Sequence, residues 1–367
     1  MKVFFAGGGT AGHLYAGIAL ADRLKQIHPN ASICFFGARG GMEERLVPKA
    51  GYSLRLVAIG AWNGSSLLRR AKTAVQLPWA CLRALFWLLS ARPELVIGVG
   101  GYASFPVVGM AGLTSWLWRG RVVVLEQNVL PGLTNRILGR LASRVFAAFP
   151  GAEGVFSEGK VVVTGNPIRS SMRRVPPAQG EVFTVFVFGG SQGAIGINSL
   201  VIEAIEALAV RNAPDRQRLR WIHQTGEKDF ERVRAAHERF STGARVEKFI
   251  YDMPDCYAQS SLLICRAGSS TLAEVATVGR AAILIPLVSA DRHQEFNAQL
   301  FAEAGAAEIR LQKQTNGAQL ADLILALAND RGRVEAMENK VTQFARPDAI
   351  DRIFADLFPS ANEKERA

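Results

Sequence analysis

Residues 2–13 read Lys2-Val3-Phe4-Phe5-Ala6-Gly7-Gly8-Gly9-Thr10-Ala11-Gly12-His13: a short apolar run, three glycines and the start of a helical pattern. The apolar run predicts a buried strand, and the glycines allow a tight turn into the helix. The first amide groups of such a helix have no partner within it and can bind an anion. This unit predicts an α/β fold with an anion site at the carboxyl end of its first strand.

The same alternation of short apolar runs and helix-length stretches continues along all 367 residues. Strands are predicted at Lys2–Ala6, Ser32–Phe36, Leu95–Val99, Val122–Leu125, Arg144–Ala147 and Val161–Thr164, and again at Phe183–Phe188, Arg220–His223, Arg245–Phe249, Leu262–Cys265 and Ala282–Ile285. Two stretches rich in Pro and Gly, Gly165–Pro167 and Val175–Gly180, separate the two series. The pattern predicts two Rossmann-like, doubly wound parallel-sheet domains, residues 1–164 and 165–345, followed by a terminal helix.

Basic residues gather in one half of the chain. Residues 1–180 hold 21 Lys and Arg against 7 Asp and Glu, a net charge of +14, whereas residues 181–367 have a net charge of −3. A basic half is expected to face an anionic partner, either a lipid surface or a nucleic acid. The cysteines lack the spacing of a zinc site, so reduced thiols are expected at Cys34, Cys81, Cys256 and Cys265.

Three segments resemble membrane signals. The apolar run at the N-terminus ends at Gly7 and is too short for the core of a signal peptide, so no export is expected. Residues 95–118 carry no charge, but glycines and Pro106 divide them into a strand and a helix, which predicts buried βα structure. Residues 62–90, interrupted by Pro78, mix basic and aromatic residues as an interfacial membrane helix does, although Leu85–Leu89 are expected in the core.

The first glycine loop also fits the GxGxxG pattern of dinucleotide-binding enzymes. Those enzymes hold the adenine ribose with an acidic residue after the second strand, where this chain has Gly37-Ala38-Arg39. His13 stands where such an enzyme needs no histidine. It is either a candidate base or a helix-start histidine bonded to the backbone, and a dehydrogenase is disfavoured.

A second glycine loop, Gly189-Gly190-Ser191-Gln192-Gly193, follows a predicted strand and matches the GxSxG pattern of serine hydrolases. A hydrolase also needs an acid and a histidine. The nearest pair is Asp291 and His293, and a spacing of two residues makes it awkward for Asp291 to orient a histidine that must reach Ser191. A phosphate-binding role is the alternative for this loop.

The third constellation is Arg266–Glu274, a turn of small residues that leads from a predicted strand into a helix. The amides and hydroxyls between Gly268 and Thr271 suit a diphosphate. Glu274 could accept hydrogen bonds from two vicinal ribose hydroxyls, and the polar stretch Asp291–Asn297 could contact the hydroxyls of a sugar. Together they predict a nucleotide-diphosphate sugar as the ligand.

These motifs resemble those of a known family, the UDP-N-acetylglucosamine transferases of bacterial peptidoglycan synthesis. The likeness covers nearly the whole chain and rests on Gly8–His13, Glu126–Asn128 with Gly132–Asn135, Thr164–Arg169, Gly189–Gly193 and Cys265–Glu274. The chain departs from the family pattern at Ala11, Ala16, Leu125 and His293. The resemblance implies a GT-B fold, with two domains facing across a cleft. The N-terminal domain would bind acceptor and membrane, the C-terminal domain UDP-GlcNAc, and residues 346–367 would pack back on the N-terminal domain.

The resemblance also implies roles for single residues. His13 is the expected general base, with Glu126 as the next candidate, and the acceptor's diphosphate is expected at Gly8, Gly9 and Thr10. UDP-GlcNAc is expected to contact Thr10, Ala11, Gly12, His13, Asn128, Arg169, Ser191, Ile250, Ser269, Ser270, Thr271, Glu274, His293, Gln294 and Asn297. Of these, Ile250 would meet the uracil, Glu274 the ribose and Arg169 the departing diphosphate.

The implied reaction moves GlcNAc to the 4-hydroxyl of MurNAc in undecaprenyl-diphosphoryl-MurNAc-pentapeptide (lipid I), with inversion at the anomeric carbon, and gives lipid II. No cofactor or metal is expected, because the chain has no DxD motif and helix N-termini with Arg169 can supply positive charge. The partner of the basic half would be an anionic membrane, at the cytoplasmic face of the bacterial inner membrane, and not a nucleic acid. A lipid-binding module without catalysis is the remaining alternative.

Overall fold

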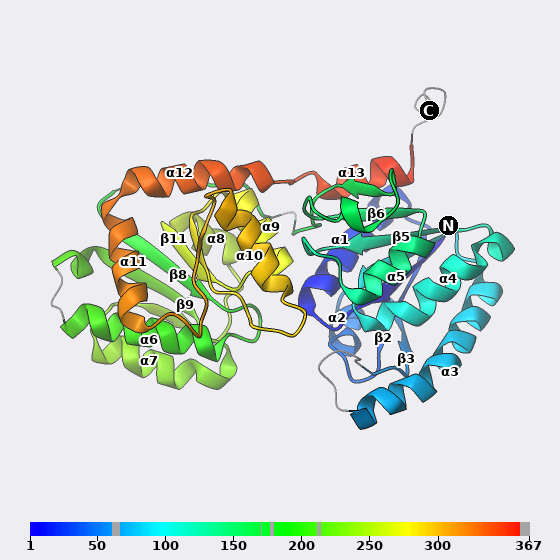
Figure 1. Cartoon of the computed structure of the whole chain (residues 1–367), viewed down its shortest axis with the longest axis horizontal. Helices are drawn as coiled ribbons and strands as arrows, with labels where there is room; N and C mark the ends of the chain where they lie inside the picture. The colour runs from blue at the N-terminus through cyan, green and yellow to red at the C-terminus, as the bar shows by residue number, and fades with distance from the viewer. Residues whose placement is uncertain (61–66, 170, 177–179, 211–213, 360–367) are drawn as a thin grey trace. The chain divides into compact units, whose positions relative to one another are not determined.

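The computed structural model describes residues 1–60, 67–169, 171–176, 180–210 and 214–359 (Figure 1). The chain forms two compact units. Unit 1 comprises Met1–Arg169 and Arg346–Ala367, and unit 2 comprises Ser170–Ala345. Each unit has its own parallel sheet flanked by helices, so the prediction of two Rossmann-like folds is confirmed.

Unit 1 is built on a parallel sheet in the order β3-β2-β1-β4-β5-β6-β7. Its strands are β1 (Lys2–Gly7), β2 (Ser32–Ala38), β3 (Ser53–Val57), β4 (Leu95–Gly100), β5 (Arg121–Glu126), β6 (Arg144–Ala147) and β7 (Val161–Val163). The strand order reverses between β1 and β4, and ligands of such sheets bind outside the carboxyl ends of the strands at the reversal. The loops after these two strands meet there, where the Gly8 N–H donates to the Gly100 carbonyl over 3.0 Å.

Helices cover both faces of this sheet. On one face α1 (Ala11–Ile27), α2 (Glu43–Lys49) and α13 (Ala349–Leu357) share a core with Phe5 and Phe35 of the sheet. On the other face α3 (Leu67–Ala91), α4 (Phe105–Trp118) and α5 (Leu133–Leu141) bury Leu88, Val107 and Leu138. The last helix of the chain therefore completes the core of the unit that contains the N-terminus.

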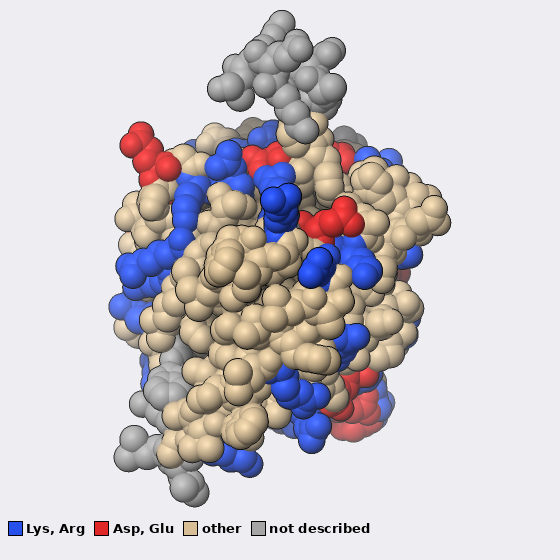
Figure 2. Space-filling view, turned by 90° about the vertical axis from the view of Figure 1, so that its right-hand side faces the viewer, with Lys and Arg blue, Asp and Glu red and all other residues tan. Residues whose placement is uncertain are grey.

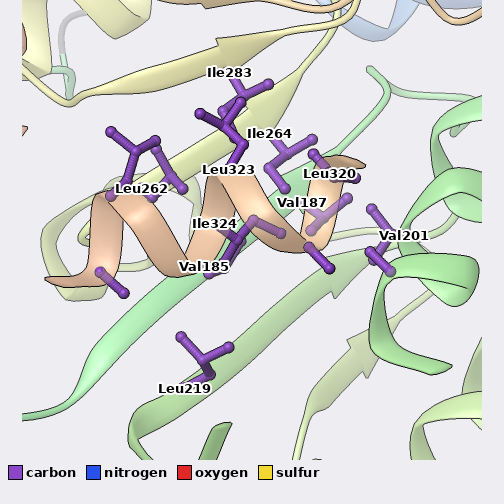
Figure 3. Packing of buried hydrophobic residues seen from close by; sticks show 14 of the residues in the cluster. Val185, Val187, Val201, Leu219, Leu262, Ile264, Ile283, Leu320, Leu323 and Ile324 are labelled. Carbon is purple, nitrogen blue, oxygen red and sulfur yellow. The ribbon is translucent and has the colours of Figure 1, made fainter. Parts of the chain in front are cut away.

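Unit 2 repeats the design with the strand order β10-β9-β8-β11-β12-β13. Its strands are β8 (Phe183–Phe188), β9 (Leu219–Gln224), β10 (Arg245–Glu247), β11 (Leu262–Cys265), β12 (Ala282–Leu284) and β13 (Glu308–Ile309). Figure 3 shows how α11 (Gly317–Asn329) packs Leu320 and Ile324 against Val185 and Ile264 of the sheet. The other helices are α6 (Ile195–Val210), α7 (Phe230–Arg239), α8 (Met253–Gln259), α9 (Ser269–Val278), α10 (His293–Glu303) and α12 (Arg331–Val341). Here the strand order reverses between β8 and β11.

The structure corrects the prediction at the sheet edges. The sequence does not predict β3 or β13: β3 alternates apolar residues with Ser53 and Arg55, and β13 has two residues. The strand predicted at Arg245–Phe249 ends at Glu247. Edge strands bury less apolar surface than central ones, so their sequence signal is weaker. The strand and helix predicted within residues 95–118 are confirmed as β4 and α4.

The segment 62–90 also differs from its prediction, and its residues 62–66 lie outside the described part of the chain. Pro78 does not interrupt the helix, because α3 runs through it from Leu67 to Ala91. After the proline, Ala80, Ala84 and Leu88 pack into the unit 1 core, and before it Thr73 is 5% exposed, so both sides of Pro78 have a buried position although the proline lacks an N–H. The expected burial of Leu85–Leu89 holds for Leu88, at 0% exposed, but not for Phe86, at 69%.

Candidate active site

In unit 2, helix α9 begins beside the strand reversal and carries Ser269, Ser270 and Thr271 in its first turn. The N–H groups of its first turn point out of the N-terminal end of the helix, where they can donate hydrogen bonds to an anion. Glu274 lies one turn further on and is half-buried, and its Oε2 accepts a hydrogen bond of 3.1 Å from the Tyr257 hydroxyl. Tyr257 is 0% exposed and meets the rings of Phe186 and Phe188 edge-on, so the carboxylate of Glu274 is held by a fixed partner.

A single buried amide links two other predicted segments of unit 2. Gln224, at the end of β9, is 3% exposed. Its Nε2 donates to the Gly190 carbonyl over 2.9 Å, and its Oε1 accepts from the Ile250 N–H, also over 2.9 Å. Gln224 thereby ties the loop that carries the exposed Ser191 to the backbone of Ile250, which is buried.

Helix α10 carries the residues predicted to contact the sugar. The Gln294 Oε1 accepts from the Leu287 N–H over 2.9 Å. Asn297 is 0% exposed and its Nδ2 donates to the Ala267 carbonyl over 3.2 Å, so its described contact supports the turn before α9. His293 Nε2 lies 3.2 Å from Asp291 Oδ2. Asp291 and His293 therefore pair despite their spacing of two residues. However, the pair uses His293 Nε2, which is the nitrogen that a serine hydrolase would need to turn towards Ser191.

In unit 1, His13 lies in the first turn of α1, with Thr10 as the N-cap that accepts from the His13 N–H over 3.4 Å. The half-buried imidazole places Nδ1 3.0 Å from the Gly8 carbonyl. A carbonyl only accepts, so Nδ1 carries the proton in this contact and Nε2 of the neutral ring is the basic nitrogen. Both readings of His13, a base and a backbone-bonded histidine, are compatible with this geometry.

Other predicted residues of unit 1 lie on the loop after β1, in the first turn of α1 and after β7. Ala11 and Gly12 are half-buried in the first turn of α1, and Arg169, after β7, is exposed. Gly9 and Thr10 are exposed, but the Gly9 N–H already donates to Glu43 Oε1 over 2.7 Å. The amide predicted for the acceptor's diphosphate thus has a carboxylate of the protein itself as its partner.

Glu126 organises the loop that carries Asn128. Its Oε1 accepts from the Asn128 N–H over 2.8 Å, and its Oε2 accepts from Asn135 Nδ2 over 2.9 Å. Burial raises the pKa of Glu126 to about 7, although the donors of Asn128, Asn135 and Gly132 lower it. The carboxyl is 2% exposed and both its oxygens are in use, which makes it a support for Asn128 and a poor second candidate for the base.

The described residues are expected to hold no metal, and their His, Cys, Asp and Glu side chains are the groups that would bind one. Within those residues no group of three or more His, Cys, Asp or Glu side chains is arranged to hold a metal ion. The structure shows free thiols at Cys34, Cys81, Cys256 and Cys265.

Known proteins are similar to this chain over nearly its whole length. The Glycosyltransferase family 28 N-terminal domain matches residues 3–147, and the Glycosyltransferase family 28 C-terminal domain matches residues 184–353. A UDP-N-acetylglucosamine–N-acetylmuramyl-(pentapeptide) pyrophosphoryl-undecaprenol N-acetylglucosamine transferase of Myxococcus xanthus is 41% identical, over 96% of this chain and 91% of its own. The chain belongs to glycosyltransferase family 28.

Other relatives of this family 28 chain agree. The transferase of the same description from Thermodesulfovibrio yellowstonii is 38% identical over 96% of this chain and 97% of its own. The crystal structure of Acinetobacter baumannii MurG superposes with a TM-score of 0.78 at 29% identity, over 97% of this chain and 98% of that one. The S. aureus MnaA–UDP structure, at 13% identity and a TM-score of 0.64, shares the fold alone.

Three residues of the candidate site are absent from the sequence prediction: Glu43, Gln224 and Tyr257. Each is buried, and its side chain forms a hydrogen bond to a predicted residue. Glu43 is 34 positions from Gly9, Gln224 is 26 from Ile250, and Tyr257 is 17 from Glu274. No local pattern signals such pairs, because they form only when separate elements pack together.

Proposed function

We propose that the chain transfers GlcNAc from UDP-GlcNAc to the 4-hydroxyl of MurNAc in undecaprenyl-diphosphoryl-MurNAc-pentapeptide, and so produces lipid II for peptidoglycan synthesis. The observation that carries the proposal is the identity of about two residues in five to named transferases over nearly the full length of both chains. The site geometry supports it, since each unit places its glycine loop at a strand reversal, after β1 in unit 1 and after β8 in unit 2.

UDP-GlcNAc binds to unit 2 in this proposal. The first turn of α9 and Ser191 receive the diphosphate, since helix-start amides and hydroxyls are donors that suit phosphate oxygens. Glu274, oriented by Tyr257, accepts from the ribose hydroxyls. The Ile250 N–H is bonded to Gln224, so the Ile250 carbonyl is the group offered to the uracil in this state.

The acceptor binds to unit 1, where His13 is the general base. The 4-hydroxyl of MurNAc gives its proton to His13 Nε2 as its oxygen bonds to the anomeric carbon of GlcNAc. The bond between that carbon and the diphosphate oxygen breaks on the opposite face, and UDP departs with the electron pair. One displacement inverts the configuration at that carbon.

The function is tested by UDP release from UDP-GlcNAc in the presence of a short-chain analogue of the lipid acceptor, with mass spectrometry of the product. The expected result is one disaccharide product for each UDP released. Well-folded protein that binds acceptor-containing vesicles but releases no UDP would support the lipid-binding alternative instead.

Glu274→Ala is expected to raise the KM for UDP-GlcNAc at least about tenfold, because hydrogen bonds to a charged acceptor contribute about 1.5–3 kcal/mol each. Tyr257→Phe keeps the carboxylate but loosens it, so a smaller rise, about threefold, is expected. Steady-state kinetics measure both values. Glu303→Ala, on the exposed far end of α10, is the matched control. An unchanged KM in Glu274→Ala would place the ribose contact elsewhere.

Turnover is expected to survive EDTA. The chain has no DxD motif, and in the proposed site helix N-termini and Arg169 stabilise the departing diphosphate, as a divalent ion does in DxD enzymes. The measurement is the rate of UDP release before and after chelation. Complete loss of activity that magnesium or manganese restores would refute this part of the mechanism.

Attachment to the cytoplasmic face of the inner membrane is proposed through an apolar patch on unit 1. The patch consists of exposed side chains on α3 and α4: Val75, Trp79, Leu82, Phe86, Leu89, Leu113, Trp116 and Leu117. The α3 members follow helical spacing, so they share one face. Figure 2 shows a broad uncharged surface on this side of the molecule, with Lys and Arg and fewer Asp and Glu around it. An apolar face with a basic rim suits the surface of an anionic bilayer.

The contacts of α3 favour attachment to the membrane surface over a span. Among the described helices, Ala71–Ala91 of α3 is long and apolar enough to cross a membrane. However, Ala84 and Leu88 on its other face are 0% exposed within the core of unit 1. A helix that crossed the bilayer would have to give up this packing.

Trp79→Glu with Phe86→Glu is expected to weaken binding to phosphatidylglycerol vesicles at least about tenfold, since each change removes a large apolar side chain from the bilayer surface. Turnover of a water-soluble acceptor should be unchanged. Val210→Glu, at an equally exposed apolar position on unit 2, serves as the control in vesicle sedimentation.

High salt should also release part of the wild-type protein from anionic vesicles, because salt screens the attraction between the basic residues and the lipid. Equal wild-type binding to neutral and anionic vesicles would contradict the role of charge.

A further inference from the structure

The glycine loop after β1 contacts the carboxylate of Glu43, which lies outside the sequence motifs. Glu43 begins the short helix α2 and is 0% exposed. Its Oε1 accepts the Gly9 N–H over 2.7 Å, while its Oε2 is buried without a hydrogen-bond partner. A buried carboxylate costs free energy unless it is bonded.

Three glycines from separate segments make the space for this side chain. A Cβ placed on Gly8 would lie 1.8 Å from Glu43 Oε1, and one on Gly41 would lie 1.9 Å from Glu43 Oε2. A Cβ on Gly37 would lie 2.6 Å from the Glu43 side chain. Gly8, which belongs to the predicted anion-binding loop, is thus fitted against a side chain of the protein itself.

The bond to Gly9 lies next to the contact that orients His13. Gly8 is held at its N–H by the Gly100 carbonyl, 3.0 Å away, and through Gly9 by Glu43. The Gly8 carbonyl then lies 3.0 Å from His13 Nδ1. Gly8 and Gly9 have positive φ angles, +144° and +84°. Because glycine has no Cβ and adopts positive and negative φ about equally well, the loop can take other conformations when these bonds are absent.

We propose that Glu43 is a positioning residue for His13: its carboxylate fixes the Gly8–Gly9 loop, whose carbonyl keeps the proton of the imidazole on Nδ1 and leaves Nε2 as the basic nitrogen. The inference rests on the proposed function only for the role of His13 as the base. It also assigns the Gly9 amide to Glu43, so the acceptor's diphosphate binds without that amide.

The charge of Glu43 acts on the same loop cluster. Burial, together with the negative charge of Glu43, raises the pKa of Tyr102, which lies in the loop after β4. A Cβ on Gly9 would lie 3.7 Å from the Tyr102 ring. The carboxylate is therefore part of the group of side chains that surrounds the start of α1.

The test is a double-mutant cycle between Glu43→Ala and His13→Ala, with Glu44→Ala as the control because Glu44 is exposed and its Oε1 accepts from the Gly40 N–H. Glu43→Ala is expected to lower kcat at least about tenfold and to leave the KM for UDP-GlcNAc within about twofold. In the His13→Ala background the same change should cost less than about twofold. Glu43→Gln, which retains an oxygen for Gly9, should restore most of the activity.

A second measurement does not depend on turnover. Nitrogen-15 NMR of labelled histidine, with His13 assigned by its loss in His13→Ala, should show the Nδ1–H tautomer in the wild type and a mixture in Glu43→Ala. If Glu43→Ala does not fold, Glu43→Asp, whose carboxylate is one methylene too short to reach Gly9, replaces it. Additive losses in the cycle, or an unchanged tautomer, would overturn the proposal. A wild-type protein without transferase activity would refute the proposed function while the NMR comparison still decides the link.

Discussion

Replacing His13 by alanine is expected to lower kcat at least about a hundredfold, because general-base catalysis typically contributes a factor of 10² to 10⁴. Donor affinity and thermal stability should change little, since the contact of the imidazole with the Gly8 carbonyl is one half-buried hydrogen bond. Steady-state kinetics with UDP-GlcNAc and a soluble acceptor, together with a thermal melt, measure the three quantities.

The matched control for His13→Ala is His28→Ala, at the other end of α1, where the histidine is exposed. This variant should keep wild-type turnover. A His13→Ala protein that is simply unstable would mark His13 as part of the scaffold. A stable and fully active one would place the base elsewhere, and Glu126 is a poor alternative because its oxygens are buried and bonded.

Arg280→Met is expected to lower the free energy of unfolding of unit 2 by about 3–5 kcal/mol, because it leaves a buried carboxylate without its partner. Arg280 and Glu338 are 1% and 5% exposed, and their Nη1 and Oε1 atoms are 3.0 Å apart. The same guanidinium donates to the carbonyls of Pro176, Tyr257 and Ala258. Hydrogen exchange with mass spectrometry resolves the loss of stability in peptides of unit 2.

Two comparisons show whether the loss comes from the unpaired charge. The double variant Arg280→Met with Glu338→Met removes both charges and should recover part of the stability. Arg352→Ala, which breaks the exposed pair with Asp348 in α13, should cost less than about 1 kcal/mol. A cost of Arg280→Met no larger than that of Arg352→Ala would contradict the expectation.

The fold was predictable because its signals are local. Each central strand is a run of apolar residues, and the two glycine loops and the turn before Ser269 follow directly in sequence from the strands that position them. The edge strand β13 escaped prediction because two residues bury too little surface to leave a pattern. Residues such as His13 and Glu274 could be proposed as site residues because they stand beside these loops.

The sequence by itself determined the alternation of strands and helices, the separation into a basic and a slightly acidic half, and the loops proposed to bind ligands. Only the tertiary structure decided which buried side chains hold those loops through hydrogen bonds: Glu43 to Gly9, Gln224 to Gly190 and Ile250, and Tyr257 to Glu274. The physical reason is that a strand or a loop is specified by neighbours in the chain. A buried hydrogen bond between distant side chains, in contrast, exists only after the helices and strands that carry them have packed, and its identity depends on the space that packing leaves.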